Sequence, residues 1–167
     1  LSIAIFLVLS VSACVAGAQD SPNLPNGYTP VASLDKAGEK GPALKVLQGQ
    51  SITFPDIAAP TDKAYIDNTG VLVQITGLDA DAEYVFALTW WDADNKGRTQ
   101  SIHMGPSAAT MTCVLPNTPA KAFFADKSTW ATIMLPVQPT AVADGTTLVE
   151  VRHETGPNAI LNSLQLL

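Results

Sequence analysis

Short β-type runs separated by turn residues are the feature that most limits the folds open to this chain. From residue 44 onward, runs rich in β-branched and aromatic residues alternate with Gly, Pro, Asn and Asp. This spacing, with little helical periodicity, is typical of all-β sandwiches. We therefore predict an all-β fold, a single β-sandwich of about eight or nine strands. The predicted strands are residues 44–47, 51–54, 71–78, 84–91, 98–104, 109–115, 129–137, 147–154 and 159–167.

One short helix is predicted between these strands. Thr118 is a suitable N-cap, Pro119 suits the first helical position, and good helix formers follow as far as Phe124. The sandwich and this helix fit one domain, residues 44–167. Residues 19–43 are rich in Pro, Gly, Asn and Asp, and they predict a flexible arm.

Residues 1–18 form an uncharged apolar run that ends in small residues, which is the pattern of a secretory signal peptide. Residues 11–14 fit a bacterial lipobox, in which cleavage before Cys14 leaves a lipid-modified cysteine. Residues 16–18 fit the competing A-x-A site, whose cleavage releases a soluble protein. A membrane-spanning helix needs about 20 apolar residues, more than this run contains. We expect a secreted, periplasmic or outer-surface protein that contacts a membrane only through lipid on Cys14.

Composition and cysteine content exclude two further features. The net charge is −6, and the 9 Lys and Arg are scattered along the chain. Nucleic-acid binding requires a clustered basic surface, so no nucleic-acid partner is expected. There are 2 cysteines, and Cys14 belongs to the leader or to the lipid anchor, so no intramolecular disulfide is expected. Alternation around Cys113 predicts a core-facing thiol that packs as a small hydrophobe.

Residues 84–104 carry the most regular alternation, and we interpret them as a β-hairpin in which Leu88 pairs with Ile102. The two-residue period of a strand then separates a core face from an outward face. The core face would contain Tyr84, Phe86, Leu88, Trp90, Gln100, Ile102 and Met104. The outward face would contain Trp91, Thr89, Thr99, Ser101 and His103.

The predicted outward face suits sugar recognition. A pyranose stacks its C–H face on an aromatic ring such as Trp91, while short hydroxyl side chains and an imidazole bind the sugar hydroxyls around the ring. The alternative is structural, because an outward Trp in a sandwich is often covered by a loop or by an arm such as residues 19–43. Both interpretations of Trp91 remain open at this stage.

The turn after Trp91 resembles a calcium loop, but it lacks acidic ligands at two positions that an EF-hand requires and is not flanked by helices. Asp92, Asp94 and Asn95 are weak candidates for a Ca²⁺ site at a sheet edge. Turn chemistry explains the same residues, because Asp and Asn side chains bond their own backbone. We expect no cofactor and no metal, with Ca²⁺ as the open alternative.

The sequence contains no recognisable catalytic motif. It has no H-E-x-x-H, no G-x-S-x-G and no Gly-rich phosphate loop, and its two histidines, His103 and His153, lack metal-ligand spacing. No pair of carboxylates can be assigned to a glycosidase cleft. The chain is therefore predicted not to be an enzyme, with a small secreted hydrolase as the second alternative.

Two resemblances add to this interpretation. Residues 75–84 resemble the fibronectin type III signature, in which Leu78 and Tyr84 would belong to a tyrosine corner. Residues 44–167 resemble, in length and order, the galactose-binding-like jelly roll shared by carbohydrate-binding modules and many secreted bacterial proteins. The second resemblance rests on the Leu78 to Tyr84 entry, the Trp91-Asp92 turn with its returning strand, the strand of residues 131–137, and the closing residues 156–164.

The jelly-roll resemblance implies a ligand site on loops that carry exposed aromatics. In this sequence the resemblance implies that Trp91 is the aromatic residue of the site, with Asn95, Arg98 and Asn162 as its polar partners. We therefore expect a non-catalytic extracytoplasmic bacterial module that recognises a glycan or a surface protein by stacking and hydrogen bonding. The first alternative is a structural or adhesive surface lipoprotein domain without a small ligand.

Overall fold

The computed structural model describes residues 28–34, 41–53, 63–92, 96–119, 121–122 and 132–167. Its largest sheet is antiparallel, with the strand order β2-β5-β12-β8-β9. In β5, buried Val71, Val73 and Ile75 alternate with half-buried residues, the pattern of a strand with one face in a core. The strands are β2 (Ala43–Gln48), β5 (Gly70–Thr76), β8 (Thr99–Gly105), β9 (Thr112–Pro119) and β12 (Thr147–Thr155).

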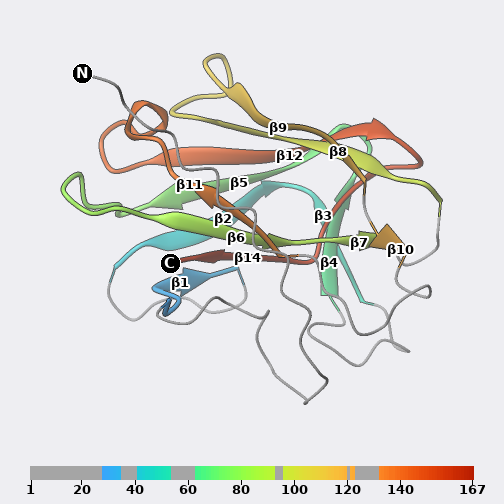
Figure 1. Ribbon diagram of the computed structural model, residues 1–167, viewed down its shortest axis with the longest axis horizontal. Coiled ribbons are helices and arrows are strands. Elements are labelled where there is room, and N and C mark those ends of the chain that lie inside the picture. The colour runs from blue at the N-terminus through green and yellow to red at the C-terminus, as the bar shows by residue number, and fades with distance from the viewer. Residues whose placement is uncertain (1–27, 35–40, 54–62, 93–95, 120, 123–131) are drawn as a thin grey trace, which may run out of the picture.

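A second antiparallel sheet, with the order β1-β14-β6-β11, forms the other layer (Figure 1). Its central strand β6 pairs with β14 on one side and with β11 on the other. Ala87 and Thr89 on β6 are as fully buried as Phe86 and Leu88, so β6 is covered on both faces. The strands are β1 (Ala32–Ser33), β6 (Val85–Thr89), β11 (Thr132–Pro136) and β14 (Ser163–Leu166).

Two smaller sheets lie at one end of the sandwich (Figure 1). One has the order β13-β4-β3, and the other is the parallel pair of β7 and β10. Among the described residues, the helical part is one 3₁₀ turn, Pro139–Ala141, and no helix is long and apolar enough to cross a membrane. The strands are β3 (Gln50–Thr53), β4 (Lys63–Asp67), β7 (Trp91–Asp92), β10 (Lys121–Ala122) and β13 (Ala159–Leu161).

One hydrophobic core lies between the two large sheets. Residues of the five-stranded sheet pack in it with residues of the four-stranded sheet, which is the defining feature of a sandwich. The predicted all-β sandwich is therefore confirmed, and Trp90 is buried as predicted. The core includes Val73, Ile75, Ile102, Met104, Val149 and Val151 from one sheet and Phe86, Leu88, Leu164 and Leu166 from the other.

The predicted hairpin of residues 84–104 is wrong. Leu88 pairs with Ile133 and Leu164, whereas Ile102 pairs with Val151 and Leu115. The chain crosses from one sheet to the other after β7, so β6 and β8 face each other across the core. Alternation predicted the burial of Phe86, Leu88, Ile102 and Met104 correctly, but it missed the burial of Thr89 and cannot tell a partner in the same sheet from one in the opposite sheet.

The structure corrects two local predictions on β9 and β10. Thr118 and Pro119 end β9, so the described part of the predicted helix is strand; residues 123–124 lie outside the described residues. Cys113 is exposed and does not face the core. A register irregularity between Ile102 and His103 places Leu115 opposite Ile102 and Cys113 opposite His103, which reverses the alternation that the sequence suggested.

The predicted arm contains part of the sandwich. Ala32 and Ser33 form β1, and Ala32 is buried and pairs with Leu166. The arm is therefore held to the four-stranded sheet at this point, and it is not a free tether over residues 32–33. The leader, including Cys14, lies outside the described residues.

The fibronectin-like signature has a structural counterpart. Leu78 is buried, and the hydroxyl oxygen of Tyr84 accepts a hydrogen bond from the backbone N–H of Asp79 at 3.0 Å. This bond resembles a tyrosine corner, in which the phenol ties down the loop before its own strand. It supports the entry into β6 and leaves the overall jelly-roll arrangement unchanged.

Candidate functional site

The residues predicted to share an outward face lie on two different sheets. Thr89 is fully buried on β6 of the four-stranded sheet, whereas Ser101 and His103 lie on β8 of the five-stranded sheet. Thr99 begins β8 at the end of the sandwich where the chain leaves β7. The predicted five-residue platform therefore does not form, because it depended on the hairpin that the structure replaces.

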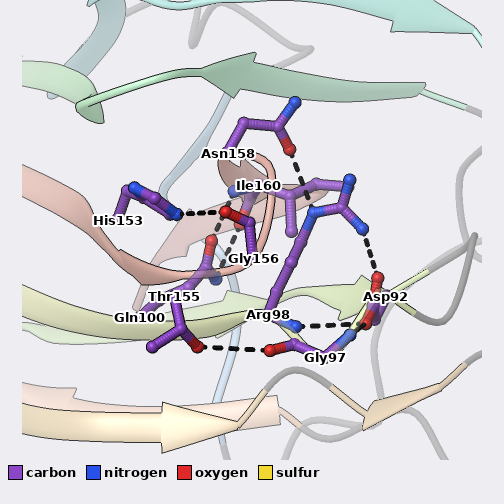
Figure 2. Close-up of polar contacts among 9 residues, drawn as sticks. All are labelled: Asp92, Gly97, Arg98, Gln100, His153, Thr155, Gly156, Asn158 and Ile160. Carbon is purple, nitrogen blue, oxygen red and sulfur yellow. Dashed lines mark hydrogen bonds and ion pairs between the residues drawn. The ribbon is translucent and has the colours of Figure 1, made fainter.

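Polar side chains converge instead at the neck of the loop between β7 and β8, where we define the Arg98 cluster as Asp92, Gly97, Arg98, Thr155 and Asn158 (Figure 2). Asp92 Oδ1 forms an ion pair with Nη1 of Arg98. Asp92 Oδ2 accepts hydrogen bonds from the backbone N–H of Gly97 at 2.7 Å and of Arg98 at 3.2 Å. Asp92 thus closes the loop on itself, as Asp often does in turns.

The cluster also joins the loop to the turn between β12 and β13. Arg98 Nε donates to the side-chain oxygen of Asn158 at 3.0 Å, and the Thr155 hydroxyl donates to the Gly97 carbonyl at 3.2 Å. Gly156 has a φ of +91° and lies so close that an added Cβ would be 3.0 Å from Cα and Cγ of Arg98. Only glycine fits this conformation and approach without strain.

Two neighbouring contacts support the same turn. The Gln100 side chain donates to the Ile160 carbonyl at 3.0 Å and accepts the Ile160 backbone N–H, which ties β8 to β13 (Figure 2). His153 Nε2 donates to the Gly156 carbonyl at 2.8 Å. His153 is therefore a half-buried residue that supports the turn, with one ring nitrogen already engaged.

Two of the predicted polar ligand contacts are buried and engaged within the protein. Arg98 is 6% exposed and belongs to the cluster just described. Asn162 is 1% exposed, its side-chain N–H donates to the Lys63 carbonyl at 3.4 Å, and its backbone N–H donates to the Thr89 carbonyl at 3.0 Å. The prediction that they contact ligand directly is therefore not supported, because both side chains hold strands together.

Trp91, the main candidate for stacking, belongs to β7 beside Asp92 and pairs with Lys121 of β10. The structure describes its backbone but not its side chain, and Asp94 and Asn95 lie outside the described residues. We call the described residues 91–92 and 96–98 the loop end; β7 pairs with β10 on one side of it, and the Arg98 cluster ties it to the turn after β12 on the other.

The calcium hypothesis finds no support at Asp92. Both oxygens of its carboxylate already bind Arg98 or backbone N–H groups, so a cation there would have to displace the guanidinium. In the described part of the chain, no group of three or more His, Cys, Asp and Glu residues is arranged to hold a metal ion.

Ser101, His103 and Glu154 form a second polar group, on the outer face of the five-stranded sheet. The Ser101 hydroxyl donates to Glu154 Oε1 at 2.5 Å, so its oxygen accepts from Nε2–H of His103 at 3.0 Å. Burial and the nearby Arg152 lower the pKa of His103, while Glu150 and Glu154 act in the opposite direction. Ser101 is 2% exposed and already donates its proton to a carboxylate, so this arrangement does not fit a serine nucleophile.

Sequence reasoning missed Thr155 and Asn158 as members of the cluster, and Gly156 as the residue that packs against Arg98. The Gly156-Pro157-Asn158 run was visible as a turn. Nothing in the sequence indicated that this turn contacts Arg98, which lies 60 residues before Asn158.

No protein-family model and no curated protein matches the sequence. Solved structures match its fold. A family 35 carbohydrate binding module from Clostridium thermocellum matches with a TM-score of 0.50 and 8% identity, over 74% of this chain and 91% of that chain. A family GH115 4-O-methyl-alpha-glucuronidase with specificity for decorated arabinogalactans matches with a TM-score of 0.51 and 13% identity, over 87% of this chain.

A beta-glucuronidase from Bacteroides uniformis matches with a TM-score of 0.50 and 11% identity, over 74% of this chain. The matched part is 19% of the GH115 glucuronidase chain and 14% of the Bacteroides uniformis beta-glucuronidase chain. Identities this low establish the fold and leave the activity open. The chain has the jelly-roll β-sandwich fold seen in carbohydrate-binding modules.

Proposed function

We propose that this protein is a non-catalytic binding module that recognises a glycan at the loop end of the sandwich, beside β7. The observation that carries the proposal is the match to a carbohydrate binding module over 91% of that module's length, so the shared part is a whole module. In the two longer glycosidases, the matched part is a small fraction of the chain, as expected for an appended module.

The proposed mechanism is stacking on Trp91 combined with hydrogen bonds from the surrounding turns. Lys96 is an exposed charged residue beside Gly97, at the turn that the Arg98 cluster joins to the residues after β12. Sugar hydroxyls are met by such side chains at the rim of an aromatic platform. No covalent step is required.

The engagement of three of the described carboxylates, Asp92, Glu150 and Glu154, favours binding over hydrolysis at these positions. A glycosidase needs one carboxylic acid and one carboxylate facing the same sugar. Here Asp92 is paired with Arg98, Glu150 with Arg152, and Glu154 accepts from Ser101. These contacts hold the three carboxylates within the protein.

The apolar leader of residues 1–18 supports an extracytoplasmic location, because it has the composition of a signal peptide. We propose that the module acts outside the cytoplasm, either released after cleavage or held by lipid on Cys14. Glycans of a cell surface or cell wall would then be accessible to it.

The test is an isothermal titration calorimetry experiment on the whole protein. It uses four soluble glycans: glucuronoxylan, arabinogalactan, galactan and xylan. We expect one of these glycans to bind, and Trp91→Ala to weaken that binding at least about tenfold, or about 1.4 kcal/mol. Tyr28→Ala is the matched control, because Tyr28 is an exposed aromatic residue beside β1. Wild-type affinity in Trp91→Ala would contradict the proposed site. Absence of binding to all four glycans would favour a structural or adhesive domain.

A further inference from the structure

We propose that Arg98 is a positioning residue, whose buried guanidinium holds β7 and the adjoining loop end in the ligand-binding conformation before any ligand arrives. The consequence for ligand affinity rests on the proposed function. The consequence for the loop end itself does not, because it follows from the contacts of Arg98 within the protein.

Burial makes the Arg98 contacts strong determinants of local structure. Arg98 is 6% exposed and Asp92 is 1% exposed, so neither charge is well hydrated. Removing one partner of such a pair leaves the other charge buried and uncompensated, which is far more costly than losing an exposed pair. The conformation in which Arg98 meets Asp92 is therefore strongly favoured over conformations that separate them.

The guanidinium acts on two chain segments at once. Through Asp92 it fixes the residue next to Trp91, and through Asn158 it fixes the turn that follows β12. The fork-like geometry of Arg allows Nη1 and Nε to address these two partners from one rigid plane (Figure 2). The Thr155 hydroxyl adds a parallel tie to the Gly97 carbonyl.

The opposite turn is shaped to receive Arg98. Gly156 adopts a φ of +91° and would place a Cβ 3.0 Å from Cα and Cγ of Arg98, so any larger residue would push the turn away. In this arrangement the Arg98 guanidinium, and not a bound metal ion, supplies the positive charge beside Asp92. We therefore expect the loop end to keep its conformation in the presence of a metal chelator.

The first readout is limited proteolysis by trypsin. Mass spectrometry measures the rate at which the exposed Lys96–Gly97 bond is cleaved. We expect Arg98→Gln to speed cleavage at Lys96 at least tenfold, Asn158→Ala to speed it about threefold, and EDTA to leave the wild-type rate unchanged. Arg152→Gln is the matched control, because Arg152 is 44% exposed on the outer face of the five-stranded sheet, and we expect the wild-type rate.

The second readout is affinity for the glycan of the panel that the wild-type protein binds. We expect Arg98→Gln to weaken this affinity at least tenfold and Arg98→Lys to recover part of the loss. We also expect a saturating amount of that glycan to slow the cleavage of Asn158→Ala at Lys96 toward the wild-type rate. Affinity is measured on protein that remains folded, because a merely structural residue would change the folded fraction and leave the affinity of that fraction unchanged.

Wild-type cleavage rates in both Arg98→Gln and Asn158→Ala would overturn the proposal, as would an opened loop with unchanged affinity. If Arg98→Gln does not fold, Asn158→Ala decides, because it keeps the ion pair and removes a single hydrogen bond. If no glycan binds the wild-type protein, the proposed function fails, while the proteolysis results still decide whether Arg98 holds the loop end.

Discussion

Two arginine–carboxylate pairs of the same chemistry lie in contrasting surroundings. Arg98 and Asp92, at the loop end, are 6% and 1% exposed, whereas Arg152 and Glu150, on the outer face of the five-stranded sheet, are 44% and 19% exposed. Asp92 also accepts two backbone N–H groups, while Glu150 receives both of its bonds from Arg152, at 2.6 and 3.1 Å.

The comparison shows that an ion pair shapes a fold according to its burial and its further contacts. In the outer pair, Arg152 is exposed and stays hydrated when Glu150 is neutralised, so little is lost. In the buried pair, the surviving charge has no such replacement. The loop end is therefore held by buried charges that depend on one another, whereas water can replace the partner of Arg152 on the outer face.

The largest expected effect is that of Asp92→Asn. The amide keeps the size of the side chain but removes the carboxylate charge beside the buried Arg98 guanidinium, so we expect a loss of about 3–5 kcal/mol in the free energy of unfolding. Urea denaturation at neutral pH measures it. A loss below about 1 kcal/mol, the size typical of exposed pairs, would remove the distinction between the two regions.

A smaller effect is expected from titration of His103 on the outer face. Its pKa is lowered below the usual 6.5 by burial and by Arg152, so the folded protein resists protonation more than the unfolded chain does. Stability is therefore fully present above pH 6.5 and falls as the pH drops below it. Urea denaturation as a function of pH should show this fall, with a flatter profile for His103→Gln.

A pH profile between 6.5 and 5 that is identical for the wild-type protein and His103→Gln would contradict the assignment.

The smallest expected effect is that of Glu150→Gln, the exposed counterpart of Asp92→Asn. We expect a change of about 0.5 kcal/mol or less, because the Arg152 guanidinium remains hydrated when its partner is neutral. The same urea denaturation series provides the value. A loss similar to that of Asp92→Asn would show that burial does not separate the two pairs.

The fold class was predictable from the sequence because alternation and turn residues are local signals. The burial of Phe86, Leu88 and Trp90 followed from the two-residue period alone. Pairing was not predictable in the same way. Leu88 meets Leu164 and Ile133, and Ile102 meets Val151, through contacts between distant segments that no local pattern encodes.

The candidate site was predicted only in part, for the same reason. Trp91 and Arg98 lie on either side of the turn, as their positions in the sequence require, but Arg98 contacts Asn158 across 60 residues and is thereby buried. Cys113 was misplaced because a register irregularity in β9 changes which residues face inward. Such irregularities arise from the fit between strands, so a single strand's sequence does not show them.

The most direct test of the account is an NMR titration of the ¹⁵N-labelled protein with the glycan that binds it. The account predicts that the perturbed backbone amides cluster at the loop end, in Trp91, Asp92, Lys96 and residues 155–158. Perturbations centred on Ser101, His103 and Arg152 of the outer sheet face, with the loop end unaffected, would contradict it.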